Sequence, residues 1–344
     1  MSQIERFAMR SDRSCTVWLE APGKLALRDE PLAPPGQHQV VCETVVSAIS
    51  TGTELAAYRG LPPLRPSVGY PRLQGYCNVG RVIAAGSEVA GLAVGDRILT
   101  MASHRSHYLA EPVDVFYKLA ADDDADRIVT AYLFHLGYNA ILRSDVRAGS
   151  RVVVIGLGLL GLTSVAMAKL AGADCYALSG QKSSSALARQ FDADGVFGRD
   201  RVGSLGDALG PSGADVVIGT TNSWSDFELA LQLAGQMGTI ACLGFPGRDE
   251  APGDFNPLQS QYFYMKQLRI EAVGWSPLGP DSRGFLRFNQ KDNIAFLAGR
   301  IGSGVLDPSP LISGRYPGER IADAYADLAA RKSDAITYLL DWAP

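Results

Sequence analysis

The sequence lacks the features of several protein classes. Its net charge is only −4 over 344 residues, and no run of basic residues is interleaved with aromatic ones, so we expect no nucleic-acid partner. The first residues, Met1 to Arg13, have no apolar core of the kind that a secretory signal needs. One uncharged segment, Val152–Ala168, is short for a membrane span and contains closely spaced glycines. We therefore expect no membrane segment.

Disulfide and zinc-ribbon patterns are also missing. The five cysteines are far apart and form no C-x-x-C pair, which argues against a disulfide framework or a structural zinc site. The expected compartment is therefore the reducing cytoplasm. Cys42, Cys175 and Cys242 are interpreted as small buried side chains in strands.

The composition is that of a globular protein, because 47% of the residues are hydrophobic and 20% are charged. The length of 344 residues is about right for two domains. Before Asp126, short strand-like segments such as Gln39–Ile49 alternate with Pro/Gly stretches such as Pro31–Gly36, which favours a small β-barrel or sandwich. After Asp126, apolar strands alternate with helices. Parallel strands need such crossovers, so this half predicts an α/β fold whose parallel sheet has helices on both faces.

A glycine-rich turn lies where a dinucleotide would bind. The turn Gly156-Leu157-Gly158-Leu159-Leu160-Gly161 directly follows the apolar strand Arg151–Ile155 and opens a helix. Gly156 permits the sharp turn, Gly158 lets the backbone approach a pyrophosphate, and Gly161 allows close packing of helix and sheet. We therefore predict a Rossmann cofactor domain that begins at this strand.

The loop after the next strand indicates the nicotinamide cofactor. In NAD-binding domains that strand commonly ends in an acid that binds the ribose hydroxyls. Here Asp174–Leu178 is followed by Ser179-Gly180-Gln181-Lys182-Ser183-Ser184, which contains no carboxylate to repel a 2′-phosphate. We predict NADP(H), held in part by Ser179, Gln181 and Lys182. The alternative is that the lysine and serines form only a solvated loop and a helix N-cap.

Over nearly its whole length the chain resembles the medium-chain dehydrogenase/reductase superfamily. The resemblance is carried by the catalytic-domain signature Gly69-Tyr70-Pro71…Gly75…Val79-Gly80-Arg81-Val82…Gly86…Gly95-Asp96-Arg97, by Thr51-Gly52-Thr53-Glu54, and by a closing helix and strand within Leu311–Leu340. It implies a GroES-like β-rich catalytic domain made of residues 1–127 and 291–344, and a Rossmann domain of residues 128–290. It also implies a homodimer joined at the sheet edge near Arg269–Val273.

The positions of the catalytic zinc ligands differ from those of the zinc-dependent members. The resemblance places Thr51, Tyr76 and Tyr132 there, and none of these is a usual zinc ligand. We therefore expect no metal, and the chain resembles the zinc-free branch around bacteriochlorophyllide hydroxyethyl dehydrogenase. An alternative zinc site built from His104, His107 and Cys77 stays open.

Without zinc, protein groups must stabilise the negative charge that forms on a carbonyl oxygen during hydride transfer. The resemblance places the phenol of Tyr76 beside the nicotinamide as proton donor, with Thr53 and His135 as relay and Tyr132 lining the site. Alternatively, Tyr76 fills the vacated cavity and bonds Glu54 or the backbone, and His135 only packs at the domain boundary.

Further cofactor contacts are expected where later strands end. The resemblance places Thr220 and Thr221 against the nicotinamide ribose. Gly244-Phe245 and Gly274-Trp275 follow two later strands at the carboxyl edge of the sheet, where ligands bind, and are expected to bracket the nicotinamide.

Three functions remain open. The first is an NADPH-dependent, zinc-independent dehydrogenase or reductase acting on a ketone or secondary alcohol. The second is a C=C reductase of the enone or quinone type. The third is an NADPH-binding protein without turnover.

Overall fold

The computed structural model describes residues 12–61, 69–248, 250–251, 253–330 and 334–342. The chain divides into two compact units, Met1–Tyr132 with Ile294–Pro344, and Leu133–Asn293. In the described residues no helix is both long and apolar enough to cross a membrane. No secondary structure was predicted from the sequence for the motif Thr51–Glu54. These residues begin the helix α2 (Thr51–Tyr58).

The first unit is β-rich. A three-stranded sheet has the order β2-β1-β4, and a larger sheet has the order β15-β16-β3-β5-β6-β8, with β7 pairing with β3. The first-unit strands are β1 (Arg13–Ala21), β2 (Lys24–Pro31), β3 (Val40–Ala48), β4 (Arg72–Leu73), β5 (Asn78–Ala85), β6 (Arg97–Thr100), β7 (His107–Ala110), β8 (Tyr117–Lys118), β15 (Ile312–Pro317) and β16 (Thr337–Asp341). Its helices are α2 (Thr51–Tyr58), α3 (Ala125–Ile128) and α10 (Ile321–Ala330).

The C-terminal segment completes the first unit. Strand β16 pairs antiparallel with β3, so residues far apart in the sequence become neighbours in one sheet. Helix α10 packs Tyr325 and Leu328 into a core cluster with Val17, Ile49 and Leu55. This packing brings α10 next to α2 and the strand end before it, which positions the site described below.

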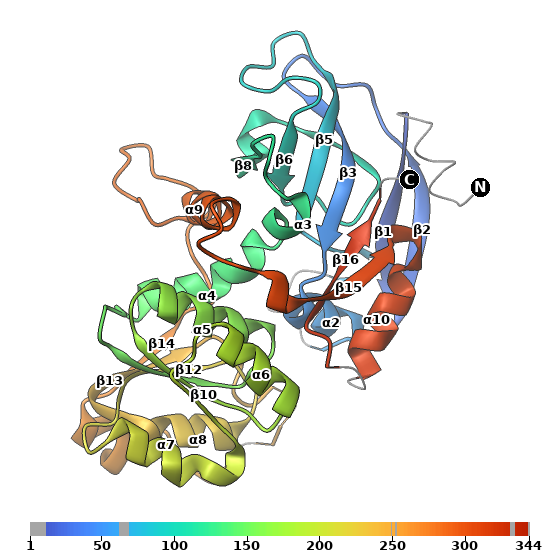
Figure 1. Cartoon of the computed structure of the whole chain (residues 1–344). Coiled ribbons are helices and arrows are strands. Elements are labelled where there is room, and N and C mark those ends of the chain that lie inside the picture. The colour runs from blue at the N-terminus through green and yellow to red at the C-terminus, as the bar shows by residue number, and fades with distance from the viewer. Residues whose placement is uncertain (1–11, 62–68, 249, 252, 331–333, 343–344) are drawn as a thin grey trace. The chain divides into compact units, whose positions relative to one another are not determined.

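The second unit has the predicted α/β fold with a parallel sheet. Its strand order is β11-β10-β9-β12-β13-β14, the order of a doubly wound dinucleotide-binding domain, which reverses between β9 and β12. Figure 1 shows α5 on one side of this sheet and α7 and α8 on the other. The second-unit strands are β9 (Arg151–Ile155), β10 (Asp174–Leu178), β11 (Gly195–Phe197), β12 (Ala214–Gly219), β13 (Ala234–Cys242) and β14 (Arg269–Ala272).

The helices of the second unit are α5 (Leu159–Leu170), α6 (Lys182–Gln190), α7 (Val202–Leu209) and α8 (Trp224–Leu233). Two helices cross the division between the units, α4 (Ala131–Arg143) and α9 (Gln290–Gly302). Strand β9 is buried at four of its five positions, which explains its uninterrupted apolar sequence. Of the cysteines, Cys42 and Cys175 are buried in strands and Cys242 is half-buried at the end of β13.

Candidate functional site

The glycine turn is closely packed between β9, α5 and the loop after β12. Gly156 has φ +91°, and a Cβ there would lie 2.5 Å from Cγ2 of Thr221. A Cβ on Gly161 would lie 1.8 Å from the carbonyl oxygen of Gly156. Both positions therefore need glycine, because the strand, the turn and α5 are in close contact.

The N-terminus of α5 is open to a ligand. Gly158 is its N-cap, makes no side-chain cap bond, and has nothing within 4 Å of a built Cβ. Leu159 and Leu160 form the first turn, so their backbone N–H groups are at the end of the helix that favours anions. These observations fit the pyrophosphate of a nicotinamide dinucleotide.

Two later loops adjoin this turn. The hydroxyl of Thr220 donates to the carbonyl oxygens of Ile155 and Gly156, each at 3.0 Å, and so joins the ends of β9 and β12. A Cβ on Gly244 would lie 2.3 Å from the carbonyl oxygen of Thr221, so the end of β13 packs against the same loop. The structure thus brings Thr220, Thr221 and Gly244 together at the point where the strand order reverses.

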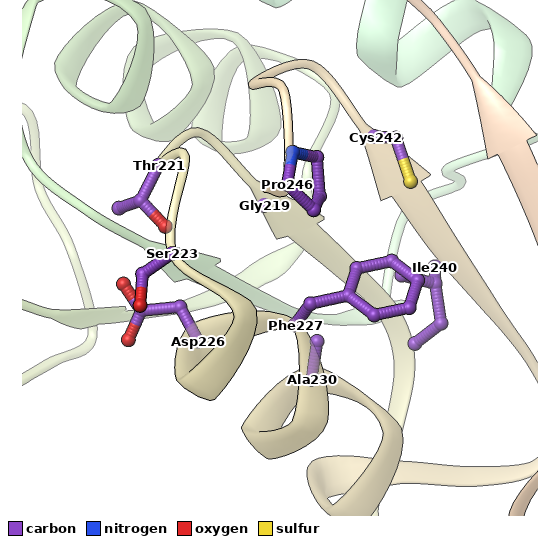
Figure 2. Close-up of a pocket in the computed structure, with 9 residues that line it drawn as sticks. All are labelled: Gly219, Thr221, Ser223, Asp226, Phe227, Ala230, Ile240, Cys242 and Pro246. Carbon is purple, nitrogen blue, oxygen red and sulfur yellow. The ribbon is translucent and has the colours of Figure 1, made fainter. Parts of the chain in front are cut away.

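Figure 2 shows a small cavity behind this loop, between α8 and strands β12 and β13. Its inner wall is apolar and includes Phe227 and Ile240, whereas Thr221, Ser223 and Asp226 supply its polar groups. Thr221 is the one predicted cofactor residue among those that line it. Its lining residues are Gly219, Thr221, Ser223, Asp226, Phe227, Ala230, Ile240, Cys242 and Pro246.

The aromatic residues predicted to bracket the nicotinamide are both exposed at chain turns. Phe245 is 40% exposed, and its N–H donates to Oδ1 of Asn222 at 3.3 Å. Trp275 is 59% exposed and follows Gly274. The side-chain amide of Asn139 on α4 donates to the carbonyl oxygens of Val273 and Trp275, which holds this turn against α4.

His135 lies in the interior of the second unit. It is 3% exposed, and its Nε2 is 3.0 Å from the hydroxyl oxygen of Ser276. Burial lowers the pKa of His135 to about 4, so the imidazole is neutral at pH 7. Its contact with Ser276 places it beside the turn that contains Gly274 and Trp275, and its role as a relay stays a prediction.

The loop after β10 holds the residues predicted to bind the ribose phosphate. The hydroxyl of Ser179 accepts from the N–H of Gln181 at 3.1 Å, and Gln181 is the N-cap of α6. Lys182, the first residue of α6, is exposed. The predicted solvated-loop alternative and a phosphate site use the same residues, so this geometry is compatible with both.

Sequence reasoning missed Arg199, which follows β11. A Cβ built on Gly180 would lie 3.9 Å from Cγ of Arg199, so this side chain adjoins the loop after β10. Its guanidinium pairs with both carboxylate oxygens of Asp226, a residue that is 5% exposed. The sequence did indicate that Arg199 follows the third parallel strand, and the carboxyl ends of such strands lie at the ligand-binding edge of the sheet.

In the first unit, two of the three residues at the expected zinc positions are in contact. The rings of Tyr76 and Tyr132 meet edge to face, with centroids 4.9 Å apart. The pKa of Tyr76 is raised well above its usual value by burial first, then by Tyr132, Glu54 and Cys77, whereas a hydrogen bond with Ser50 lowers it. The phenol is therefore protonated at neutral pH. Thr51 and Thr53 lie half-buried in the first turn of α2.

A buried polar network lies beside Tyr76. The carboxylate of Glu54 accepts from the backbone N–H of Ser50 at 2.7 Å, from Nε2 of His104 at 3.0 Å, and from the hydroxyl of Tyr325. Nδ1 of His104 is 2.8 Å from the hydroxyl oxygen of Ser47. Glu54 and His104 are 2% and 0% exposed, so these bonds replace water around a buried charge.

This network overturns the alternative zinc site. His104 bonds Ser47 and Glu54, His107 bonds the hydroxyl of Ser106 at 3.1 Å, and Cys77 is buried with a pKa raised well above its usual value by burial. Within the described ranges, no group of three His, Cys, Asp or Glu side chains could hold a metal ion.

The comparisons with known proteins agree with this architecture. Residues 160–288 match the family model described as zinc-binding dehydrogenase. Over 92 residues the chain is 37% identical to 2-desacetyl-2-hydroxyethyl bacteriochlorophyllide A dehydrogenase of Cereibacter sphaeroides, a match that covers 27% of this chain and 29% of that protein.

Solved structures with the same fold span nearly the whole chain. A Sinorhizobium meliloti protein assigned as a zinc-binding dehydrogenase, solved with NADP, has a TM-score of 0.77 and 20% identity, covering 96% of this chain and 99% of its own. An alcohol dehydrogenase of Escherichia coli, solved with NADH, has a TM-score of 0.79 and 17% identity with the same coverage. Residues 160–288 thus match a dehydrogenase family model, and the chain as a whole has the fold of these solved dehydrogenases.

Proposed function

We propose that this protein is a zinc-independent, NADPH-dependent oxidoreductase that transfers hydride to or from a ketone or secondary alcohol. The observation that supports it most is Tyr76. A protonated phenol stands at a position where zinc-dependent relatives have a ligand, and the neighbouring carboxylate, Glu54, is already bonded by three donors. Such a phenol can replace a Lewis acid as the group that bonds the substrate oxygen.

The cofactor, when bound, supplies or accepts the hydride. The N-terminus of α5 and the turn at Gly158 would hold its pyrophosphate, and Thr220 and Thr221 would bind its ribose. In the reductive direction the substrate oxygen takes the proton of Tyr76 as hydride reaches the carbonyl carbon. The electron pair of the broken O–H bond stays on the phenol oxygen, and Thr53 relays the replacing proton.

The preference for NADPH rests on charge in the second unit. The loop Ser179–Ser184 has no carboxylate, it contains Lys182, and Arg199 adjoins it at Gly180. A cationic side chain in this place accommodates a 2′-phosphate, and an acidic one repels it. Relatives of the same fold are solved with either NADP or NADH, so the choice in this chain depends on these local side chains.

A C=C reductase is the second candidate. A phenol can also donate a proton to an enolate, and the rings of Tyr76 and Tyr132 meet edge to face. An activated enone and its saturated ketone, offered separately, distinguish the two reactions by which bond is reduced.

Two structural expectations belong to the same proposal. We propose that residues 1–127 with 291–344 are the catalytic domain and residues 128–290 the cofactor domain. We also propose a cytoplasmic homodimer that forms through β14, since this strand ends the order of the six-stranded sheet. Sedimentation equilibrium of the full chain tests the dimer, and a monomer across the micromolar range would contradict it.

The first experiment is to bind NADPH and NADH to metal-stripped protein and then follow oxidation of the bound cofactor on a panel of ketones and enones. We expect NADPH to bind more tightly and to be oxidised without added metal. Tyr76→Phe should remove most of the turnover and leave NADPH binding unchanged. Activity that returns only with added zinc, or a fully active Tyr76→Phe protein, would overturn the proposal.

A further inference from the structure

The side chain of Arg72 lies on the buried face of the three-stranded sheet. Arg72 belongs to β4 and pairs with Leu19 of the neighbouring strand β1. Residues that pair in an antiparallel sheet point their side chains to the same face, and the next residue along the strand points to the other face. Leu19 is 0% exposed, whereas Leu73 is 40% exposed. The inner face is therefore the one that Arg72 shares with Leu19.

This inner face carries part of a hydrophobic core cluster. Val17 lies two positions before Leu19 and pairs with Leu27 of β2, so both side chains share the face. They pack in one cluster with Tyr325 of α10. Burial raises the pKa of Tyr325 well above its usual value, and the positive charge of Arg72 acts in the opposite sense. A cation thus lies beside the core of the first unit.

This cation has no partner among the residues that the structure describes. Nε of Arg72 is shielded from water and has no hydrogen-bond acceptor, and the guanidinium forms no ion pair with a described carboxylate. The buried carboxylate of Glu54 pairs with His104 and accepts from the hydroxyl of Tyr325 instead. Arginine stays charged in proteins, and a charge shielded from water is costly without a counter-ion. Arg72 as a whole is half-buried, so an anion from solvent can reach the rest of its side chain.

The segment that carries Arg72 also carries the proposed proton donor. Tyr76 is four positions after Arg72, so their Cα atoms are at most about 14 Å apart. Between them, the side-chain amide of Gln74 donates to the backbone carbonyl of Glu54 at 3.5 Å, which holds the segment against α2. An anion bound to Arg72 would therefore lie within the length of a small molecule from the phenol of Tyr76.

We propose that Arg72 binds an oxyanion group of the substrate, a carboxylate or a phosphate, so that the reacting ketone or secondary alcohol is an anionic compound. This inference rests on the proposed function, in which Tyr76 gives its proton to the substrate oxygen, and it names the substrate class. The planar guanidinium matches the oxygens of a carboxylate or phosphate. With the anionic end held by Arg72 and the reacting oxygen by Tyr76, the substrate has a fixed orientation, which one hydrogen bond does not give.

Paired substrates test this assignment by kinetics. Levulinate and its methyl ester differ in the carboxylate charge, and dihydroxyacetone phosphate and dihydroxyacetone differ in the phosphate. We expect the protein to prefer the anionic member of at least one pair. In Arg72→Gln the kcat/KM for that anion should fall roughly 10- to 100-fold, mainly through KM, and the kcat/KM for its neutral partner should fall far less. Arg72→Lys keeps the charge and should retain part of the preference.

Arg28→Gln is the matched control for the loss of a positive charge. Arg28 belongs to β2 of the same sheet and pairs with Thr16, so it lies on the face opposite to that of Arg72. Its guanidinium is 4.6 Å from the ring centroid of Trp18 and 3.2 Å from the carboxylate of Glu20. We expect this variant to keep the wild-type preference for the anionic substrate. An equal loss of preference in both variants would show a general effect of charge and would overturn the inference.

Binding of an anion at Arg72 can also be measured without turnover. At constant ionic strength, malonate or inorganic phosphate should raise the melting temperature of the wild-type protein and of Arg28→Gln, and should raise that of Arg72→Gln much less. Phosphate that binds in the second unit stabilises all three proteins equally, so only the difference between them reports on Arg72. An equal rise in all three proteins with both probes would overturn the anion site.

The outcomes separate this inference from the function on which it rests. If turnover depends on Tyr76 but Arg72→Gln affects charged and neutral substrates alike, the anion site is wrong and the proposed function stands. If anion binding depends on Arg72 but Tyr76→Phe is fully active, the proposed function is wrong and the anion site stands. A purely structural role, in which Arg72 only offsets the charge of Glu54, would lower the melting temperature of Arg72→Gln without changing the preference between substrates. Should Arg72→Gln not fold, Arg72→Lys takes its place in both measurements, and a wild-type protein that prefers the neutral member of both pairs would overturn the inference.

Discussion

Replacing Arg199 with alanine should weaken the binding of NADPH far more than the binding of NADH. Arg199 adjoins Gly180 in the loop after β10, where the 2′-phosphate of NADPH is proposed to bind. NADH has a hydroxyl group in that place and gains little from a cation. The substitution therefore acts on the difference between the two cofactors and not on the phosphates that they share.

The size of the effect follows from the contacts of Arg199. A hydrogen bond to a charged group contributes about 1.5–3 kcal/mol, which corresponds to roughly a 10- to 150-fold change in Kd. The carboxylate of Asp226, which is 5% exposed, would also lose its partner and add negative charge near the phosphate. Asp226→Asn keeps the guanidinium and removes that charge, so it should reduce NADPH affinity much less than Arg199→Ala.

Calorimetric titration of both cofactors into each variant measures this prediction. Arg201→Ala is the matched control, because Arg201 belongs to the same short helical turn and is exposed. We expect the ratio of the NADH Kd to the NADPH Kd to fall at least 10-fold in Arg199→Ala and to stay constant in Arg201→Ala. An equal loss for the two cofactors, or an equal loss in the control, would refute the reasoning.

Three further predictions concern the second unit. Gly161→Ala should abolish the rise in melting temperature that NADPH produces, because the new Cβ would lie 1.8 Å from the carbonyl oxygen of Gly156, and a normal rise would contradict this. The pKa of His135 is about 4 in the folded protein and about 6.5 in the unfolded chain, so the unfolded chain binds a proton first as the pH falls. The free energy of unfolding should therefore fall by up to about 3 kcal/mol between pH 6.5 and pH 4. Urea unfolding should show a smaller pH dependence in His135→Gln. The ammonium group of Lys266 donates to the carbonyl oxygens of Leu231, Gln232 and Ala234 at the end of α8. Lys266→Met should therefore lower the free energy of unfolding by about 1–3 kcal/mol. An unchanged midpoint of urea unfolding would show that these bonds contribute nothing.

The parallel sheet was predictable because its central strands are largely buried. The apolar segments Arg151–Ile155 and Asp174–Leu178 coincide with β9 and β10. Helix α7 was missed, since Gly203 and Gly206 lower its intrinsic helix propensity by about 1 kcal/mol each. It forms because Leu205 and Leu209 are buried in the core cluster under the sheet, a gain that only the tertiary structure reveals.

The candidate residues of the two units differed in how much the sequence could predict. The glycine turn depends on backbone geometry within six consecutive residues, so its pattern is local. The place of Arg199 just after a parallel strand put it at the ligand-binding edge of the sheet, but its contact with Gly180 follows only from the pairing of β10 with β11. Tyr325 reaches Glu54 across 271 positions, so this contact depends on the return of α10 to the first unit.

This distant contact also bears on how a site without zinc ligands can remain well defined. A metal holds its ligands directly, and the proposed metal-free site must hold Tyr76 by other means. Glu54, whose charge acts on the phenol, bonds the backbone N–H of Ser50, and His104 and Tyr325 bond Glu54. Because each of these groups is buried, breaking any one bond leaves an unpaired polar group, which costs about 1–3 kcal/mol. The network therefore resists rearrangement, and that resistance is what a proton donor of fixed orientation requires.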